Sequence, residues 1–169
     1  IHDKQLKHRC LKGFHIKPES DYLKSRKPVL VNDDCKITLA APSQSMTEYY
    51  FKNADADEVV FIHEGTGVLK TMYGNIDFAY GDYLVIPRGT IYQFHFNQSS
   101  NRIMIIESAG PITFPKRYRN DFGQLMEHSP FCERNIRKPA TLETHDVQGR
   151  FLLYIKKQDI IYPYHYLNH

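Results

Sequence analysis

The chain has 169 residues, a formal net charge of +3 and no apolar run near the ~20 residues of a membrane span. This length suffices for one domain with a sizeable core, and the mild charge predicts neither a nucleic-acid nor a membrane partner. No signal-peptide pattern opens the chain. The three cysteines, Cys10, Cys35 and Cys132, are odd in number and far apart, which predicts reduced thiols and a cytoplasmic protein.

Residues 1–27 are basic and show no hydrophobic period, and we predict an irregular lead-in that lies on the domain or on a neighbouring subunit. Its charges are expected to be solvated rather than bound to phosphate. From residue 28 to residue 110, short apolar runs alternate with turn signals, which predicts a β domain. The strands expected around the central stretch are 29–31, 37–41, 46–51, 57–64, 68–73, 76–80 and 102–108.

The central stretch, residues 81–97, contains a turn, a strand, a corner and a second strand. Gly81 and Gly89 can adopt the positive φ that tight corners need, and Pro87 lacks the N–H of a ladder. After the corner, aromatic and polar residues alternate with a period of two. Gly65 and Gly67 are interpreted as a hairpin-type connection. Glycine-rich turns without strand–helix alternation predict an all-β sandwich or jelly-roll barrel rather than a parallel α/β sheet.

Residues 111–149 are charged, aromatic and interrupted by prolines, which predicts an extended irregular arm with at most a short helix near 124–128. Loops of this length usually have a function, and contact with a partner subunit is the one we expect. As evidence for RNA binding, the basic and aromatic cluster of the arm is weak. The candidate interface residues are Lys116, Arg117, Tyr118, Arg119, Glu127 and His128. Residues 150–169 are interpreted as a β segment that leads into a further C-terminal domain.

The stretch 81–97 resembles one of the two motifs by which cupins are identified, so we expect a cupin-type barrel. A cupin metal site takes two His and a Glu from one strand and a further His two strands later. Here Glu58 stands at the Glu position, residues 51–54 contain no His, and Tyr92 replaces the later His. Because a lone carboxylate does not hold a divalent metal against water, we predict a metal-free barrel filled with aromatic rings. A buried Glu58 then needs a donor, and the Tyr92 hydroxyl is the candidate.

Three histidines could suggest a catalytic site. By strand parity, His63 and His95 fall on the face opposite Glu58 and Tyr92, so we interpret them as surface or interface residues. His128, next to Glu127, is expected to make a packing or interface hydrogen bond. No nucleophile elbow, phosphate loop or dinucleotide fingerprint is present, and we predict no catalytic residue in this segment.

The residues resemble the N-terminal half of homogentisate 1,2-dioxygenases, particularly bacterial ones. The stretches that carry the resemblance are Asn53-Ala54-Asp55-Ala56-Asp57-Glu58, His63-Glu64-Gly65-x-Gly67, 81–89 and, in the arm, 114–119, 127–130 and 133–134. The resemblance implies two tandem β domains in trimers or hexamers. It also implies a non-haem Fe(II) that opens the ring of homogentisate with O₂ to give maleylacetoacetate, in tyrosine and phenylalanine catabolism.

In that family the iron ligands, two His and one Glu, lie in the C-terminal domain in a His-x5-Glu pattern followed by a later His. This chain contains no such pattern, so no catalytic residue is carried over and the segment alone is expected to be inactive. The alternative hypothesis is a metal-free cupin that acts as a small-ligand sensor or interaction module. A sugar isomerase or a metal-binding cupin is disfavoured by the missing histidines.

Overall fold

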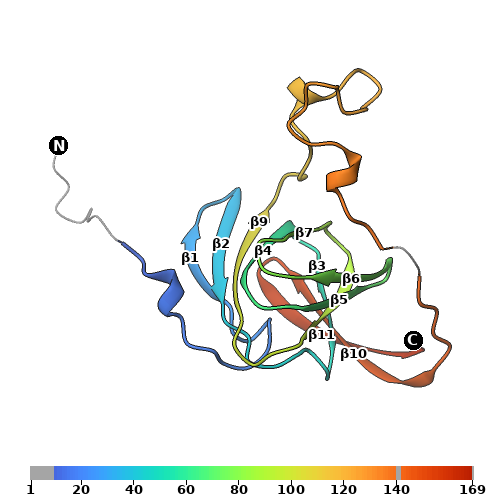
Figure 1. Cartoon of the computed structure of the whole chain (residues 1–169). Coiled ribbons are helices and arrows are strands. Elements are labelled where there is room, and N and C mark those ends of the chain that lie inside the picture. The colour runs from blue at the N-terminus through green and yellow to red at the C-terminus, as the bar shows by residue number, and fades with distance from the viewer. Residues whose placement is uncertain (1–9, 140–141, 169) are drawn as a thin grey trace.

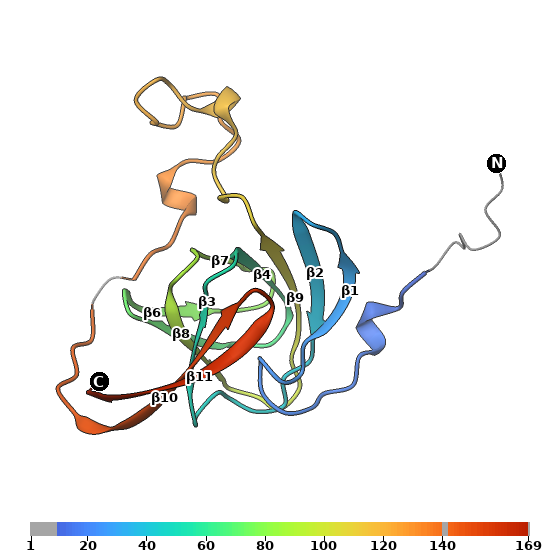
Figure 2. The ribbon, with the colours of Figure 1, turned by 180° about the vertical axis from the view of Figure 1, so that it is seen from behind.

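The computed structural model describes residues 10–139 and 142–168, in which eleven strands form two antiparallel-rich sheets (Figures 1 and 2). Sheet A has the order β1-β2-β9-β4-β7, and sheet B has the order β11-β10-β3-β8-β5-β6. The strands are β1 (Lys27–Val31), β2 (Cys35–Ala40), β3 (Tyr50–Asn53), β4 (Asp57–Glu64), β5 (Gly67–Thr71), β6 (Gly74–Phe78), β7 (Tyr83–Ile86), β8 (Ile91–Phe96), β9 (Arg102–Ser108), β10 (Gln148–Lys157) and β11 (Ile160–Asn168). Among the helices within these residues, none is long and apolar enough to cross a membrane.

The two sheets enclose one aromatic-rich core, and the predicted cupin jelly roll is confirmed. Along β4 and β9 buried and partly exposed residues alternate, because successive side chains of a strand point to opposite faces. Tyr92 and Phe94 of β8 are almost fully buried, and Phe96 packs against them at the edge of the core. The rings of Phe94 and Phe96 are stacked with centroids 5.6 Å apart. The barrel interior is therefore filled by side chains.

Two glycine corners carry the chain from sheet A to sheet B. Residues 65–66 connect β4 in sheet A to β5 in sheet B, so the hairpin interpretation of Gly65 and Gly67 was wrong. Gly65 has φ +129°, and a Cβ there would lie 2.3 Å from Asn101 Oδ1. The corner at Pro87 likewise joins β7 to β8, with Gly89 at φ +86° and its N–H donating to Asn53 O at 2.8 Å. The glycines allow the backbone to turn at these two corners. Which sheet the following strand joins depends on how its side chains pack in the core.

The lead-in enters the barrel. It contains the short 3₁₀ helix η1 (Gly13–His15), and the segment before β1 then packs into the core. Tyr22 and Ser25 are fully buried, and the Asp21 carboxylate accepts the N–H groups of Leu23 and Lys24 at 3.1 and 3.0 Å. This tight turn directs the side chain of Arg26, two residues after Lys24, into the core. Residues 1–9 of the expected lead-in lie outside the described residues.

The last two strands complete sheet B. Strand β10 pairs parallel with β3, with Leu153 opposite Tyr50, and antiparallel with β11. Leu153 is buried and the Tyr154 ring packs edge-on against Tyr49, with centroids 4.7 Å apart. The segment 148–168 is thus part of the barrel wall.

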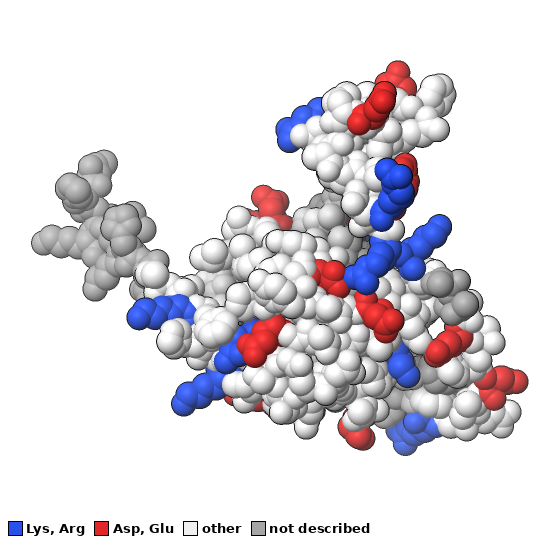
Figure 3. Space-filling view, viewed as in Figure 1, with Lys and Arg blue, Asp and Glu red and all other residues white. Residues whose placement is uncertain are grey.

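The arm projects away from the barrel (Figures 1 and 2). It contains the 3₁₀ helices η2 (Lys116–Tyr118) and η3 (Glu133–Asn135), whereas residues 124–128 form no helix and Leu125 makes an isolated β-bridge with Arg119. A small cluster holds the arm together, with the Phe131 ring 5.0 Å from Phe114 and 5.9 Å from Tyr118. Figure 3 shows charges of both signs on the arm and a broad uncharged area on the barrel below it.

Candidate functional site

A buried ionic cluster occupies the barrel interior at the position where Glu58 was expected to face inward. Glu58 on β4 lies directly opposite Glu107 on β9. Two like charges facing each other across a pair of strands are destabilising unless a cation lies between them. Arg26 supplies that cation, with Nη2 donating to Glu58 Oε1 at 2.7 Å and Nη1 donating to Glu107 Oε1 at 3.0 Å. One guanidinium therefore bridges both carboxylates.

The remaining carboxylate oxygens are also bonded. The hydrogen bond predicted between Tyr92 and Glu58 is present, with the hydroxyl donating to Oε2 at 2.5 Å. Glu107 accepts Asn53 Nδ2 at 3.2 Å and Lys156 Nζ at 2.6 Å. Two buried carboxylates are thus balanced by two cations, one from the lead-in and one from β10.

Aromatic rings cover the Arg26 guanidinium, and burial keeps the Tyr92 hydroxyl protonated. The Arg26 guanidinium lies 4.4 Å from the Tyr22 ring centroid and 5.2 Å from that of Phe51, so its faces are covered by rings. Burial, and then the negative charge of Glu58, raise the pKa of Tyr92 well above its usual value. The phenol therefore stays protonated and acts as a donor.

These residues do not fit a metal ion. Both Glu58 oxygens already accept a hydrogen bond, and the group that approaches the carboxylate pair is itself a cation. Within residues 10–139 and 142–168, no group of three His, Cys, Asp or Glu side chains could hold a metal. The guanidinium supplies the positive charge that a divalent ion would bring to two facing carboxylates.

The hydroxyl of Tyr92 should contribute measurably to stability. Tyr92→Phe leaves Glu58 Oε2 buried without this donor, so we expect the free energy of unfolding to fall by about 1–3 kcal/mol. Urea unfolding followed by circular dichroism measures the difference. Tyr73→Phe, at an exposed turn, is the matched control and should change stability by less than about 0.5 kcal/mol. An unchanged midpoint for Tyr92→Phe would contradict the prediction.

The three histidines lie apart from the cluster. His63 is exposed and its ring meets that of Phe14 edge-on at 5.3 Å. His95 is partly buried, its Nε2 lies 2.6 Å from Gln93 Oε1, and burial lowers its pKa. The ring of His128 lies in the arm, 6.5 Å from that of Tyr118. The candidate arm residues lie together around η2 and the following turn, and Arg117 stacks on Tyr118 at 4.7 Å.

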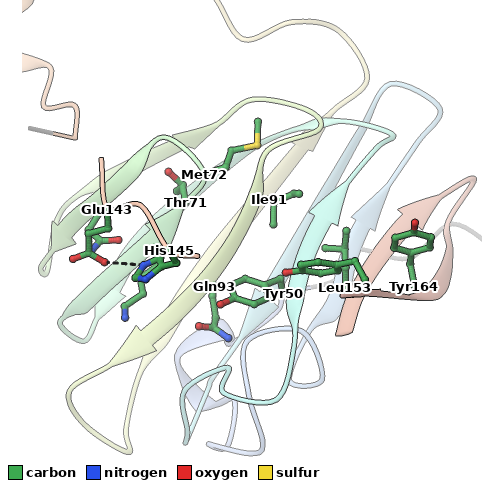
Figure 4. A pocket seen from close by; sticks show the side chains of 12 residues that line it. Tyr50, Thr71, Met72, Ile91, Gln93, Glu143, His145, Leu153 and Tyr164 are labelled. Atoms are coloured by element: carbon green, nitrogen blue, oxygen red, sulfur yellow. Dashed lines mark ion pairs between the residues drawn. The ribbon is translucent and has the colours of Figure 1, made fainter. Parts of the chain in front are cut away.

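A groove of about 610 Å³ lies on the outer face of sheet B (Figure 4). All six strands of sheet B contribute lining residues, and the segment that precedes β10 forms one wall, where His145 Nε2 lies 3.6 Å from Glu143 Oε2. Gln93 points into the groove from β8 while donating to Tyr49 O at 3.0 Å. The other lining residues are Tyr50, Lys70, Thr71, Met72, Asn75, Ile91, Leu153, Tyr164 and Tyr166.

Sequence reasoning missed this groove. Its walls come from strands far apart in the chain, and no local motif marks them. The one available signal was the alternation of Tyr164 and Tyr166 on the last strand, which places two rings on one face.

A family model described as "Homogentisate 1,2-dioxygenase N-terminal" matches residues 23–120. A Saccharolobus solfataricus protein named "Putative dioxygenase" is 36% identical over 154 residues, which are 91% of this chain and 39% of that protein. Homogentisate 1,2-dioxygenase of Bradyrhizobium diazoefficiens is 32% identical over 76 residues, which are 44% of this chain and 17% of that enzyme.

Among solved structures, a cupin-2 domain protein of Shewanella frigidimarina is 27% identical with a TM-score of 0.43, covering 50% of this chain and 79% of that one. The chain thus spans well under half the length of the two curated relatives.

Proposed function

This chain belongs to the family of homogentisate 1,2-dioxygenase N-terminal domains, and from that premise we propose that it is the non-catalytic barrel of a ring-cleaving dioxygenase. The proposed substrates are O₂ and homogentisate or a closely related hydroxylated aromatic acid, giving maleylacetoacetate in the case of homogentisate. We place the protein in the cytoplasm as a homo-oligomer. Its Fe(II) would be held by residues beyond those of this chain.

One observation supports the non-catalytic role most strongly. The Arg26 guanidinium, which bridges Glu58 and Glu107, occupies the part of the barrel interior that Glu58 faces. Neither carboxylate has an oxygen left without a protein partner, so the cluster offers no open position for substrate or O₂. The charge balance that stabilises the fold is the same feature that leaves this interior without reactive groups. The proposed contribution of the barrel is therefore scaffold and subunit contact.

The test uses the protein produced from its native gene. We expect an intact mass well above that of 169 residues, iron near one per subunit, and rapid O₂ uptake with homogentisate. The matched control is the 169-residue chain, for which we expect neither iron nor uptake. A native gene product without iron or uptake would overturn the dioxygenase proposal.

The groove of sheet B favours a second candidate function, a metal-free cupin that binds a small ligand. Its rings, Tyr50 and Tyr164, and its polar groups, Gln93 and His145, are the kind of lining that small-molecule sites have. Calorimetric titration of the 169-residue chain with a panel of aromatic acids tests this reading. Saturable binding that Gln93→Ala removes would support it, and no heat from any acid at millimolar concentration would reject it.

A further inference from the structure

The outer face of sheet A carries two apolar rows. Cross-strand pairing places Leu39, Met104, Phe61 and Tyr83 side by side in one row, and Ile37, Ile106, Val59 and Val85 in the next. We call these eight side chains the outer apolar face. Each strand contributes two of them, and none is charged.

This pattern is unusual for an antiparallel sheet. Such sheets commonly bury one apolar face and expose a polar one, so their strands alternate. Here the inner face contains Glu58 and Glu107, whereas the outer face is entirely apolar at its centre. Tyr83 and Val85, on the edge strand β7, are 64% and 53% exposed. The other six side chains are partly exposed, so the face is a candidate interaction site.

One end of the outer apolar face is hollowed. A cavity of about 340 Å³ opens between the lead-in and the sheet, with Phe14 and Ile16 on one side and Phe61, Tyr83 and Met104 on the other. The lead-in is fixed there, because Arg102 Nε donates to Phe14 O at 2.9 Å and the guanidinium stacks on the Phe14 ring at 4.6 Å. The cavity is thus a built apolar recess of a size that admits an aromatic side chain.

The outer apolar face is too small to make a stable interface by flat contact alone. With strands about 4.8 Å apart and a rise of about 3.4 Å per residue, two rows across four strands cover roughly 260 Å². A stable interface needs about 800 Å² from each partner. An inserted aromatic side chain adds about 150–250 Å², and the segment that carries it adds more. The small area of the outer apolar face therefore favours a protruding arm, rather than a second flat sheet, as the partner that covers it.

The arm of this chain carries such an aromatic side chain at its tip. Phe122 is 90% exposed at the tip. The tip is an ordered turn, because Asn120 Oδ1 accepts the N–H groups of Phe122 and Gln124, both at 3.0 Å, and Gly123 adopts φ +83°. Two contacts hold the base of the arm to its own barrel, Ile112 N to Asp57 Oδ2 at 2.8 Å and Arg137 to Asp82 at 2.6 Å. The arm as a whole projects away from its own barrel (Figures 1 and 2).

We propose that the arm of one copy docks on the outer apolar face of a second copy, with Phe122 in the recess beside Phe14. The contact is heterologous, since an arm on one subunit meets a sheet on the next, and repetition of such a contact closes a ring or continues as a filament. The proposal concerns assembly and does not depend on the dioxygenase activity.

The test measures the mass of the full-length protein by light scattering during size exclusion at tens of micromolar. We expect an oligomer for the wild type and a monomer for two variants, Phe122→Asp on the arm and the double variant Tyr83→Asp/Val85→Asp on the face. Mixing the two monomeric variants should give a dimer, because one arm and one face remain intact in the pair. Met72→Asp/Tyr73→Asp, on the β5–β6 turn, is the matched control and should keep the wild-type mass.

Circular dichroism of each variant separates loss of assembly from loss of fold, because the substituted side chains are 46% to 90% exposed and the spectra should match the wild type. A monomeric wild type, or an oligomer that persists in either variant, would overturn the proposal. Dissociation by the face variant alone would show that another occupant covers the face, namely a flat second copy or the rest of a longer chain. Mixed variants that stay monomeric would rule out the heterologous contact.

Discussion

Arg26→Ala is expected to lower the free energy of unfolding by about 3–5 kcal/mol, the range for breaking one side of a buried ion pair. The substitution leaves Glu58 and Glu107 facing each other in the core with only Lys156 to balance them. Removal of the guanidinium also exposes the faces of the Tyr22 and Phe51 rings that it covers. Urea unfolding at neutral pH measures the change in midpoint.

The control is Arg137→Ala, which removes the exposed ion pair with Asp82 and should cost at most about 1 kcal/mol. Arg26→Lys should recover only part of the loss, because an ammonium cannot reproduce the fork that bridges two carboxylates. Guanidinium ion at millimolar concentration should raise the midpoint of Arg26→Ala but not that of the wild type. A cost below about 1 kcal/mol for Arg26→Ala would show that the bridge contributes little.

Phe94→Ala is expected to cost about 3–5 kcal/mol, because it opens a cavity in the middle of the core. The Phe94 ring is fully buried, stacks on Tyr22 at 4.3 Å, and meets Tyr92 and Phe78 edge-on at 5.7 and 5.6 Å. Loss of one ring therefore removes contacts to both the lead-in and the barrel wall. The same urea experiment measures the effect.

Tyr80→Ala removes an aromatic ring that is 74% exposed, and it should change stability by less than about 0.5 kcal/mol. If Phe94→Ala cost no more than Tyr80→Ala, the rings would not form the packed interior described above. Phe94→Leu, which refills most of the volume, should lose less than Phe94→Ala.

Much of the barrel was predictable because its signals are local. The bounds predicted for β4 and β9 agree with the structure, since strand periodicity and flanking turn residues both fall within a short window. The inward direction of Glu58 and Tyr92 followed from the same period of two. Their mutual hydrogen bond followed from the rule that buried polar groups are paired.

The remaining features depend on partners that no local pattern identifies. Arg26 lies 81 residues from Glu107 in the sequence, and Lys156 lies 49 residues from it. Because neither partner is near in the sequence, both cations looked like ordinary surface charges. The glycines at residues 65 and 67 indicated a turn, but a turn signal does not reveal whether the next strand pairs with the last one or crosses to the other sheet. The outer apolar face was visible only once the register had aligned four strands.

The parallel pairing of β10 with β3 has a consequence for synthesis. Tyr50 leaves the ribosome about a hundred residues before Leu153, its neighbour in the finished sheet. At a translation rate of about 5–20 residues per second, β3 waits roughly 5–20 s with one edge unpaired. An open strand edge invites pairing with other chains during that time. The nascent chain is therefore open to aggregation at this edge until β10 emerges.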